Sequence, residues 1–144
     1  MEGPQESWTR ETILVVEDAD SIRRMVCSML RQAGYRCLDA ADGDEGLRIF
    51  LSDPAVFDLV LTDVIMPRMG GPELARHVAQ ERPDLRVMFM SGFSDDPIVR
   101  GIERTPGLFM PKPFTAGVLM EKIRQSLDAP WHGLPDASFG ARVR

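Results

Sequence analysis

The sequence is poor in the residues that build metal clusters, disulfide frameworks and membrane spans. Only two cysteines and two histidines occur among 144 residues, and none of them stand at the spacing of a zinc site. No apolar run approaches the ~18 residues needed to cross a bilayer, and the N-terminal segment lacks the apolar core of a signal peptide. We therefore expect a soluble protein in the cytoplasm.

Positive charge is also scarce and dispersed. The 17 Lys and Arg residues are outnumbered by 22 Asp and Glu residues, which gives a formal net charge of -5. A nucleic-acid-binding surface needs a clustered basic patch, so we expect no direct binding to nucleic acid. Cys27 and Cys37 each lie in an apolar pattern that is typical of a buried, reduced thiol.

The sequence does contain a regular alternation of short apolar runs and amphipathic segments. The expected strands are 12–17, 36–40, 58–62, 86–90 and 108–110; the expected helices are one from Asp20 to a stop at Gly34, then 42–51, 71–81, 95–103 and 115–127. Such a βα repeat predicts a parallel sheet covered on both faces. The expected fold class is α/β, a flavodoxin-like doubly wound sandwich with strand order 2-1-3-4-5.

Polar residues follow the expected strands at the points where the ligand crevice of such a fold opens. Glu17 and Asp18 follow the first strand, Asp63 the third, Ser91 the fourth and Lys112 the fifth. The strand order places the first and third strands side by side, so three carboxylates share one crevice. Like charges this close need a shared proton or a cation.

Hard carboxylate oxygens suit Mg²⁺ better than zinc. A carboxylate can act as the nucleophile that forms an aspartyl phosphate, which makes Asp63 a candidate phosphoryl acceptor. Lys112 could neutralise phosphoryl oxygens and Ser91 could donate a hydrogen bond to one. The sequence therefore predicts phosphoryl chemistry at the carboxyl ends of the strands.

The sequence resembles the receiver domain of two-component response regulators over about residues 12–128. The resemblance rests on four motifs: LVVEDAD, LTDVIMPRMGG, MSGF and PKPF. This resemblance implies that Asp18 and Asp63 ligate Mg²⁺ through their side chains, with the backbone carbonyl of Ile65 as a third ligand and Glu17 acting through water. It also implies that the phosphoryl donor is a phosphohistidine on a histidine kinase or phosphotransfer protein. Residues 1–11 would be an N-terminal extension, 12–128 the receiver domain and 129–144 a tail or linker.

The resemblance implies a switch as well. Phosphorylation would draw Ser91 inward and let Phe109 fill the vacated space, which would shift the face of the fourth helix, fifth strand and fifth helix. The alternative for Phe109 is a fixed core aromatic. Ile65 and Phe93 would flank the path of the hydrolytic water, and because neither can orient a water, we expect a long-lived aspartyl phosphate.

Alternative functions remain open at this stage. A Mg²⁺-dependent phosphatase would want a second acid where Ile65 stands, a mononucleotide binder would not tolerate the acidic EDAD segment, and a docking pseudo-receiver would not need the full phosphorylation set. The favoured function is a signalling phosphoacceptor that is not an enzyme. The sequence leaves open a single-domain regulator or part of a hybrid sensor histidine kinase, and a monomer or a homodimer. His77 and His132 are expected at the surface, and Trp8 and Trp131 outside the domain body, packing onto it or onto a neighbour.

Overall fold

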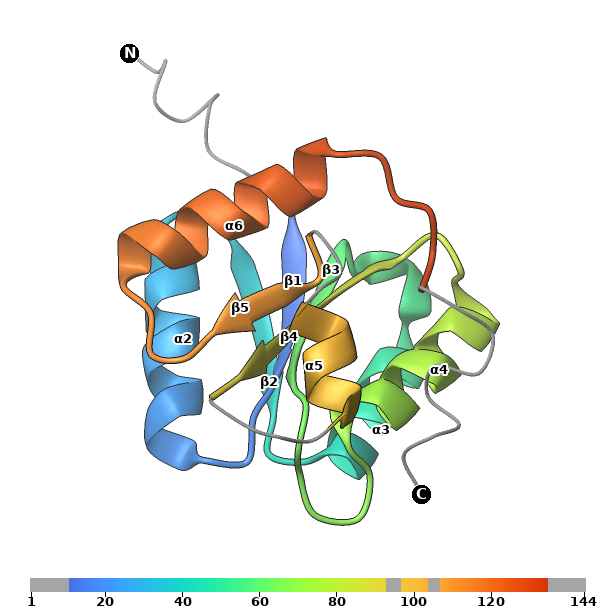
Figure 1. The fold of residues 1–144 in the computed structure, drawn as a ribbon. Helices are drawn as coiled ribbons and strands as arrows, with labels where there is room; N and C mark the ends of the chain where they lie inside the picture. Colours follow the sequence, from blue (N-terminus) through green and yellow to red (C-terminus); the bar gives the residue numbers. More distant parts are fainter. Residues whose placement is uncertain (1–10, 93–96, 104–106, 135–144) are drawn as a thin grey trace.

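The computed structural model describes residues 11–92, 97–103 and 107–134. One parallel sheet has the strand order β2-β1-β3-β4-β5, which confirms the predicted topology (Figure 1). Its strands are β1 (Thr12–Val16), β2 (Arg36–Ala40), β3 (Leu59–Asp63), β4 (Arg86–Ser91) and β5 (Phe109–Pro111). Ile13 lies opposite both Cys37 of β2 and Leu59 of β3, so β1 is an interior strand.

The helices alternate with the strands. They are α2 (Asp20–Gln32), α3 (Gly43–Ser52), α4 (Gly71–Glu81), α5 (Pro97–Glu103) and α6 (Ala116–Asp128), with a short 3-10 helix, η1 (Pro54–Val56). The Asp42 carboxylate accepts the Glu45 N–H at 2.8 Å and caps α3. Gly34, with φ of 98°, follows α2 and is the predicted stop.

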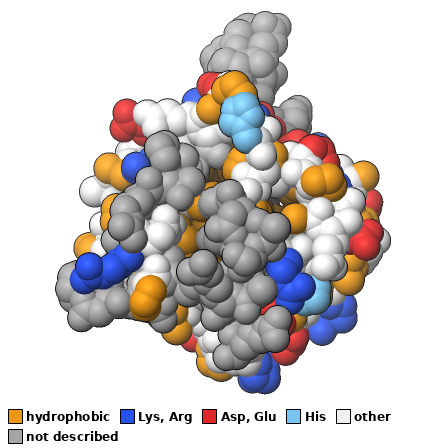
Figure 2. Space-filling model, turned by 45° about the vertical axis from the view of Figure 1, so that its right-hand side comes forward, with side chains coloured by type: hydrophobic (Ala, Val, Ile, Leu, Met, Phe, Trp, Pro, Cys, Tyr) orange, Lys and Arg blue, Asp and Glu red, His pale blue; other side chains and the backbone are white. Residues whose placement is uncertain are grey.

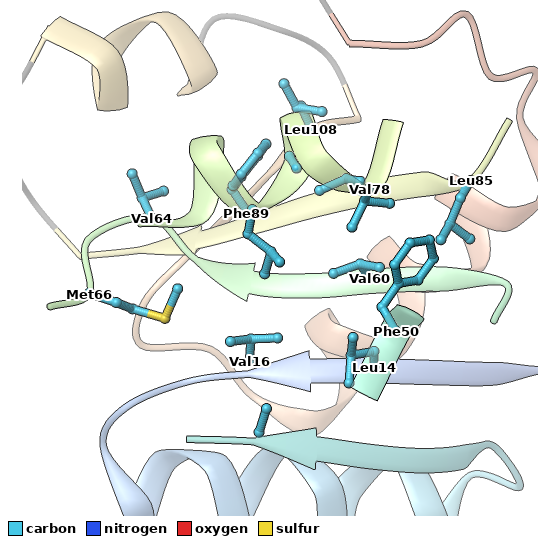
Figure 3. Close-up of a cluster of buried hydrophobic side chains, with 14 of the residues drawn as sticks. Leu14, Val16, Phe50, Val60, Val64, Met66, Val78, Leu85, Phe89 and Leu108 are labelled. Atoms are coloured by element: carbon cyan, nitrogen blue, oxygen red, sulfur yellow. The ribbon is translucent and has the colours of Figure 1, made fainter. Parts of the chain in front are cut away.

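The sheet separates two apolar layers because side chains alternate along each buried strand. Ile13 and Val15 face α2 and α6, whereas Leu14 and Val16 face α3, α4 and α5. Figure 3 shows the second layer, in which Phe50, Phe89 and Val78 converge from a helix, a strand and a helix. We call this layer the α3–α5 core; full burial of each large apolar side chain contributes about 1.5–3 kcal/mol.

Two arginine side chains hydrogen-bond backbone carbonyls at the amino end of the sheet. Arg82 donates to the carbonyls of Pro54 and Phe57 at 2.9 and 2.7 Å. Arg86, the first residue of β4, donates from Nε to the Ser126 carbonyl at 2.6 Å and from Nη2 to the Ala129 carbonyl. The Arg82 bonds tie the loop before β3 to the end of α4, and the Arg86 bonds tie the end of α6 to the sheet.

Helix α5 is described from Pro97, within the predicted range 95–103, and residues 93–96, which include Phe93, lie outside the described residues. The 3-10 helix η1 was not predicted. None of the helices in the described part of the chain is long and apolar enough to span a membrane. On the face drawn in Figure 2, Lys and Arg side chains occupy several separate places among acidic and apolar ones.

Candidate phosphoryl-acceptor site

The predicted carboxylates and the lysine meet at the carboxyl end of the sheet. Glu17 and Asp18 directly follow β1, Asp63 is the last residue of β3 and Lys112 directly follows β5. One oxygen from each of the three acids lies within 4.8 Å of the others. The Lys112 ammonium lies 2.8 Å from Oε1 of Glu17 and 3.3 Å from Oδ2 of Asp63.

Backbone contacts hold Asp63 in place. The Val64 N–H donates to its Oδ1 at 3.0 Å, and the Gly71 N–H donates to the Val64 carbonyl at 2.8 Å. Gly71 approaches so closely that a Cβ there would lie 2.2 Å from the Asp63 carbonyl oxygen. A side chain at residue 71 would therefore displace the backbone of Asp63, which explains the glycine at the start of α4.

Glu17 is the most deeply buried of the three acids, with 1% of its surface exposed. Its Oε2 accepts the Ala19 N–H at 3.0 Å, and Arg23 donates to its backbone carbonyl at 2.9 Å. Its Oε1 lies 2.8 Å from the Lys112 ammonium, so the buried carboxylate of Glu17 shares that ammonium with Asp63.

This charge arrangement is unfavourable for an ionised Asp63. Burial raises the pKa of Asp63, the negative charge of Glu17 raises it further and Lys112 offsets part of the effect, which leaves it at about 6. Burial also lowers the pKa of Lys112, but its contacts with Glu17 and Asp63 outweigh burial, so the net change is upward. Asp63 is consequently mostly ionised at neutral pH while remaining poorly compensated.

The residues fit a bound Mg²⁺. Three carboxylates from two strand ends offer hard oxygen donors, and Lys112 is the one cation that pairs with them among the described residues. Mg²⁺ typically uses one or two carboxylates and keeps several waters, and the exposed side chain of Asp18 leaves room for them.

The predicted switch residues lie nearby but do not contact the acids. Ser91 is the buried last residue of β4, and its hydroxyl donates to the Gly92 carbonyl at 3.0 Å rather than to Asp63. Phe109 is half-buried and packs against the α3–α5 core. Ile65, two residues after Asp63, is 58% exposed, so its side chain lies on the open side of the site.

Sequence reasoning missed two arginines that support the site. Arg23, in the first turn of α2, also bonds Asp39 at 3.0 Å and Asp20 at 2.7 Å. Arg68, with a left-handed φ of 66°, pairs with Asp42 at 2.9 Å and so joins the acceptor loop to the loop before α3. Asp39 and Asp42 are distant in sequence from the arginines that they pair with, and hydrophobic periodicity cannot reveal such pairs.

The two cysteines and the two histidines belong to no cluster of potential metal ligands in the described part of the chain. Cys27 and Cys37 are free and buried, as predicted, with sulfur atoms 2.9 Å apart. His77 lies 3.8 Å from Glu73 of the same helix, and His132 is exposed. Trp131 packs against the α3–α5 core, which confirms one of the two predicted alternatives for it.

Comparison with known proteins agrees with this geometry. The model of the response regulator receiver domain family matches residues 13–124. The sensor kinase CckA of Brucella abortus is 35% identical over 118 residues, covering 81% of this chain and 12% of the kinase. The response regulator receiver protein CpdR of the same organism is 39% identical over 82 residues, covering 57% of this chain and 67% of CpdR. The chain thus spans only a small part of the first of these relatives.

Solved structures show the same fold. The receiver domain of the hybrid histidine kinase CckA aligns with a TM-score of 0.68 at 35% identity, covering 81% of this chain and 99% of that domain. A receiver domain protein from Clostridium thermocellum aligns with a TM-score of 0.73 at 28% identity, covering 82% and 94%.

Proposed function

This chain belongs to the response regulator receiver domain family, and we propose that it takes a phosphoryl group from a phosphohistidine onto Asp63 in a Mg²⁺-dependent reaction. Receiver domains are signalling phosphoacceptors, and they interact with histidine kinases. The assignment to Asp63 is supported mainly by one observation: Lys112 contacts both Asp63 and Glu17. These three residues come from three different strand ends. A structural ion pair would not need a second buried acid beside the first.

In this proposal, a carboxylate oxygen of Asp63 attacks the phosphorus, the bond between phosphorus and the donor imidazole breaks, and the imidazole leaves. Asp63 must be ionised to attack, and a pKa of about 6 leaves it so at neutral pH. Lys112 lies 3.3 Å from the Oδ2 atom of Asp63 and can pair with a transferred phosphoryl oxygen. Mg²⁺, held by Asp18, Asp63 and the Ile65 carbonyl, with Glu17 acting through water, would neutralise phosphoryl charge.

Phosphorylation then changes the surface. We propose that the Ser91 hydroxyl leaves the Gly92 carbonyl for a phosphoryl oxygen and that Phe109 moves toward the space vacated. The register supports this coupling, because Phe89 and Ser91 of β4 pair with Phe109 and Pro111 of β5. The affected face would be the one formed by α5, β5 and α6.

The site does not favour a phosphatase that acts on external substrates. Such an enzyme wants an acid near the nucleophile as proton donor, and the residue two positions after Asp63 is the exposed, apolar Ile65. We therefore propose a signalling role without turnover of an external metabolite. The free thiols of Cys27 and Cys37 suit a reducing compartment, which supports a cytoplasmic location.

The test is phosphate uptake from acetyl phosphate, followed by intact mass. We expect one phosphate on the wild type with Mg²⁺, none with a chelator and none on Asp63→Asn. Glu81→Gln removes an exposed acid at the end of α4, outside the carboxylate trio, and serves as the control, with uptake like the wild type. Equal uptake by Asp63→Asn and wild type would overturn the assignment.

A further inference from the structure

The chain after α6 folds back across the amino end of the sheet. It runs from the end of α6 toward the side of the sheet covered by α4 (Figure 1). The Trp131 indole donates to the Pro83 carbonyl at 3.1 Å, and both Trp131 and Leu134 pack against the α3–α5 core. We call residues 129–134 the C-terminal segment.

The start of this segment is fixed to β4. Arg86 donates to the carbonyls of Ser126 and Ala129, on either side of the end of α6. These two hydrogen bonds fix the direction in which the chain leaves α6. Trp131 consequently lies at the edge of the sheet beside β5. The docking of the segment therefore depends on the fold and not on Trp131 alone.

A pocket of about 270 Å³ lies between the C-terminal segment, α6 and β5. Its walls include Trp131 on one side, Lys122 and Ser126 of α6 on another, and Phe109 and Met88 of the sheet. Phe109 is half-buried and is also the residue proposed to move on phosphorylation. The segment and the switch aromatic thus share one pocket.

We propose that the C-terminal segment docks on the face formed by β5 and α6 as an intramolecular ligand. We also propose that phosphorylation at Asp63 weakens this docking because the Phe109 ring moves. This inference rests on the proposed function. When the Phe109 ring moves toward Ser91, the pocket loses an apolar wall and Trp131 loses part of the surface that keeps it from water. Residue 109 is three positions before Lys112, so β5 links the pocket directly to the acceptor site.

The coupling has a thermodynamic consequence for other partners. Whatever binds the same face must displace the C-terminal segment or bind beside it, and linkage requires that displacement and phosphorylation favour each other. We expect phosphorylation to raise the ratio of released to docked segment by about fivefold, the lower end of typical allosteric coupling.

Trp131 is the natural probe. The Trp8→Phe variant leaves it as the only tryptophan of the chain, and acrylamide quenching of its fluorescence reports exposure. In this parent variant we expect quenching to rise after treatment with Mg²⁺ and acetyl phosphate, with uptake verified by intact mass on the same sample. Confirmed uptake with unchanged quenching would overturn the coupling while leaving the phosphoacceptor function intact.

A second arm does not depend on phosphorylation. Phe109→Leu in the same background should already show raised quenching without donor, and little further rise with it. Phe114→Leu is the matched control, because Phe114 is a partly buried ring of the opposite layer that does not line the pocket; it should behave as the parent. If Phe109→Leu quenches like the parent without donor, the proposal is wrong, even if no variant takes up phosphate.

Discussion

The amino and carboxyl ends of the sheet differ in how their charged side chains are compensated. At the amino end, the guanidinium groups of Arg82 and Arg86 each satisfy two backbone carbonyls. At the carboxyl end, two buried acids share one ammonium, with Asp18 close by. Both ends contain buried or half-buried charge, but at the carboxyl end the negative charges outnumber the positive one.

The difference separates structural charge from functional charge. A charge that is fully hydrogen-bonded holds two segments together and has little left to offer a ligand. A charge that is buried with incomplete compensation costs stability in the free protein and regains it when a cation or phosphoryl group arrives. The carboxyl end is therefore expected to gain most from ligands, and the amino end to lose most from mutation.

The largest effect is expected from the loss of Lys112. Lys112→Ala should slow phosphorylation by about 100-fold, the usual cost of removing one group that stabilises transferred charge. It should still bind Mg²⁺, because the three carboxylates remain. Initial rates of phosphate uptake and calorimetric titration with Mg²⁺ check both parts. The control is Arg48→Ala at an exposed position of α3, which should phosphorylate at the wild-type rate; a normal rate for Lys112→Ala would remove the lysine from the mechanism.

At the opposite end, Arg86→Ala should lower the free energy of unfolding by about 2 kcal/mol, because two carbonyls near the end of α6 lose their donor. Arg48→Ala, at an exposed position of α3, should change it by less than about 0.5 kcal/mol. Urea unfolding measures both. Equal small losses would show that the amino end does not depend on its arginine bonds.

Loss of Asp18 is expected to act on the metal rather than on the fold. Asp18→Ala should weaken Mg²⁺ affinity by about tenfold or more, since even changes to supporting groups around a metal cost that much. Glu81→Ala removes an exposed acid outside the trio and should leave the affinity unchanged. Isothermal titration calorimetry with Mg²⁺ measures both affinities. An unaltered Mg²⁺ affinity in Asp18→Ala would show that the proposed set of Mg²⁺ ligands is wrong.

The smallest effect concerns the lifetime of the aspartyl phosphate. Ile65→Asn should speed its decay by about threefold, because a polar side chain on the open side of the site can orient the attacking water. Ile65→Leu keeps the site apolar and should decay like the wild type. Phe93→Glu should act in the same direction as Ile65→Asn. The phosphorylated fraction is followed by intact mass after donor removal, and unchanged or slower decay in both polar variants would refute the explanation.

Most of the fold could be predicted because its signals are local. The strand at 36–40 and the helix at 71–81 lie where their apolar patterns placed them, and Gly34 ends α2 as its backbone freedom allows. The short helix η1 lacked any such pattern.

The candidate site could be predicted only to the level of which residues meet. Strand-end positions brought Asp63 and Lys112 together once the strand order was known. The preference of the lysine for Glu17 over Asp63, 2.8 against 3.3 Å, depends on side-chain reach and burial. The supports from Arg23 and the pocket beside Trp131 depend on contacts between segments distant in sequence, for which the chain carries no local pattern.

The most direct test of the contrast between the two ends is the stability of Asp63→Asn with and without Mg²⁺. Asp63 has its pKa raised from 3.8 to about 6, so its contribution to stability is fully present below about pH 4 and is lost as the pH rises through about 6. The full pKa shift corresponds to a change of about 3 kcal/mol in the free energy of unfolding. Partial exposure of Asp63 and screening by solvent reduce this change to about 1–2 kcal/mol.

We therefore expect Asp63→Asn to be more stable than wild type by about 1–2 kcal/mol at pH 7.5 in a chelator, with the gap closing toward pH 4. Saturating Mg²⁺ should stabilise the wild type more than the variant and narrow or reverse the order. Urea unfolding of both proteins under the three conditions provides the measurement. If Asp63→Asn is less stable than wild type at pH 7.5 without metal, the carboxyl end does not hold uncompensated charge, and the contrast between the two ends is wrong.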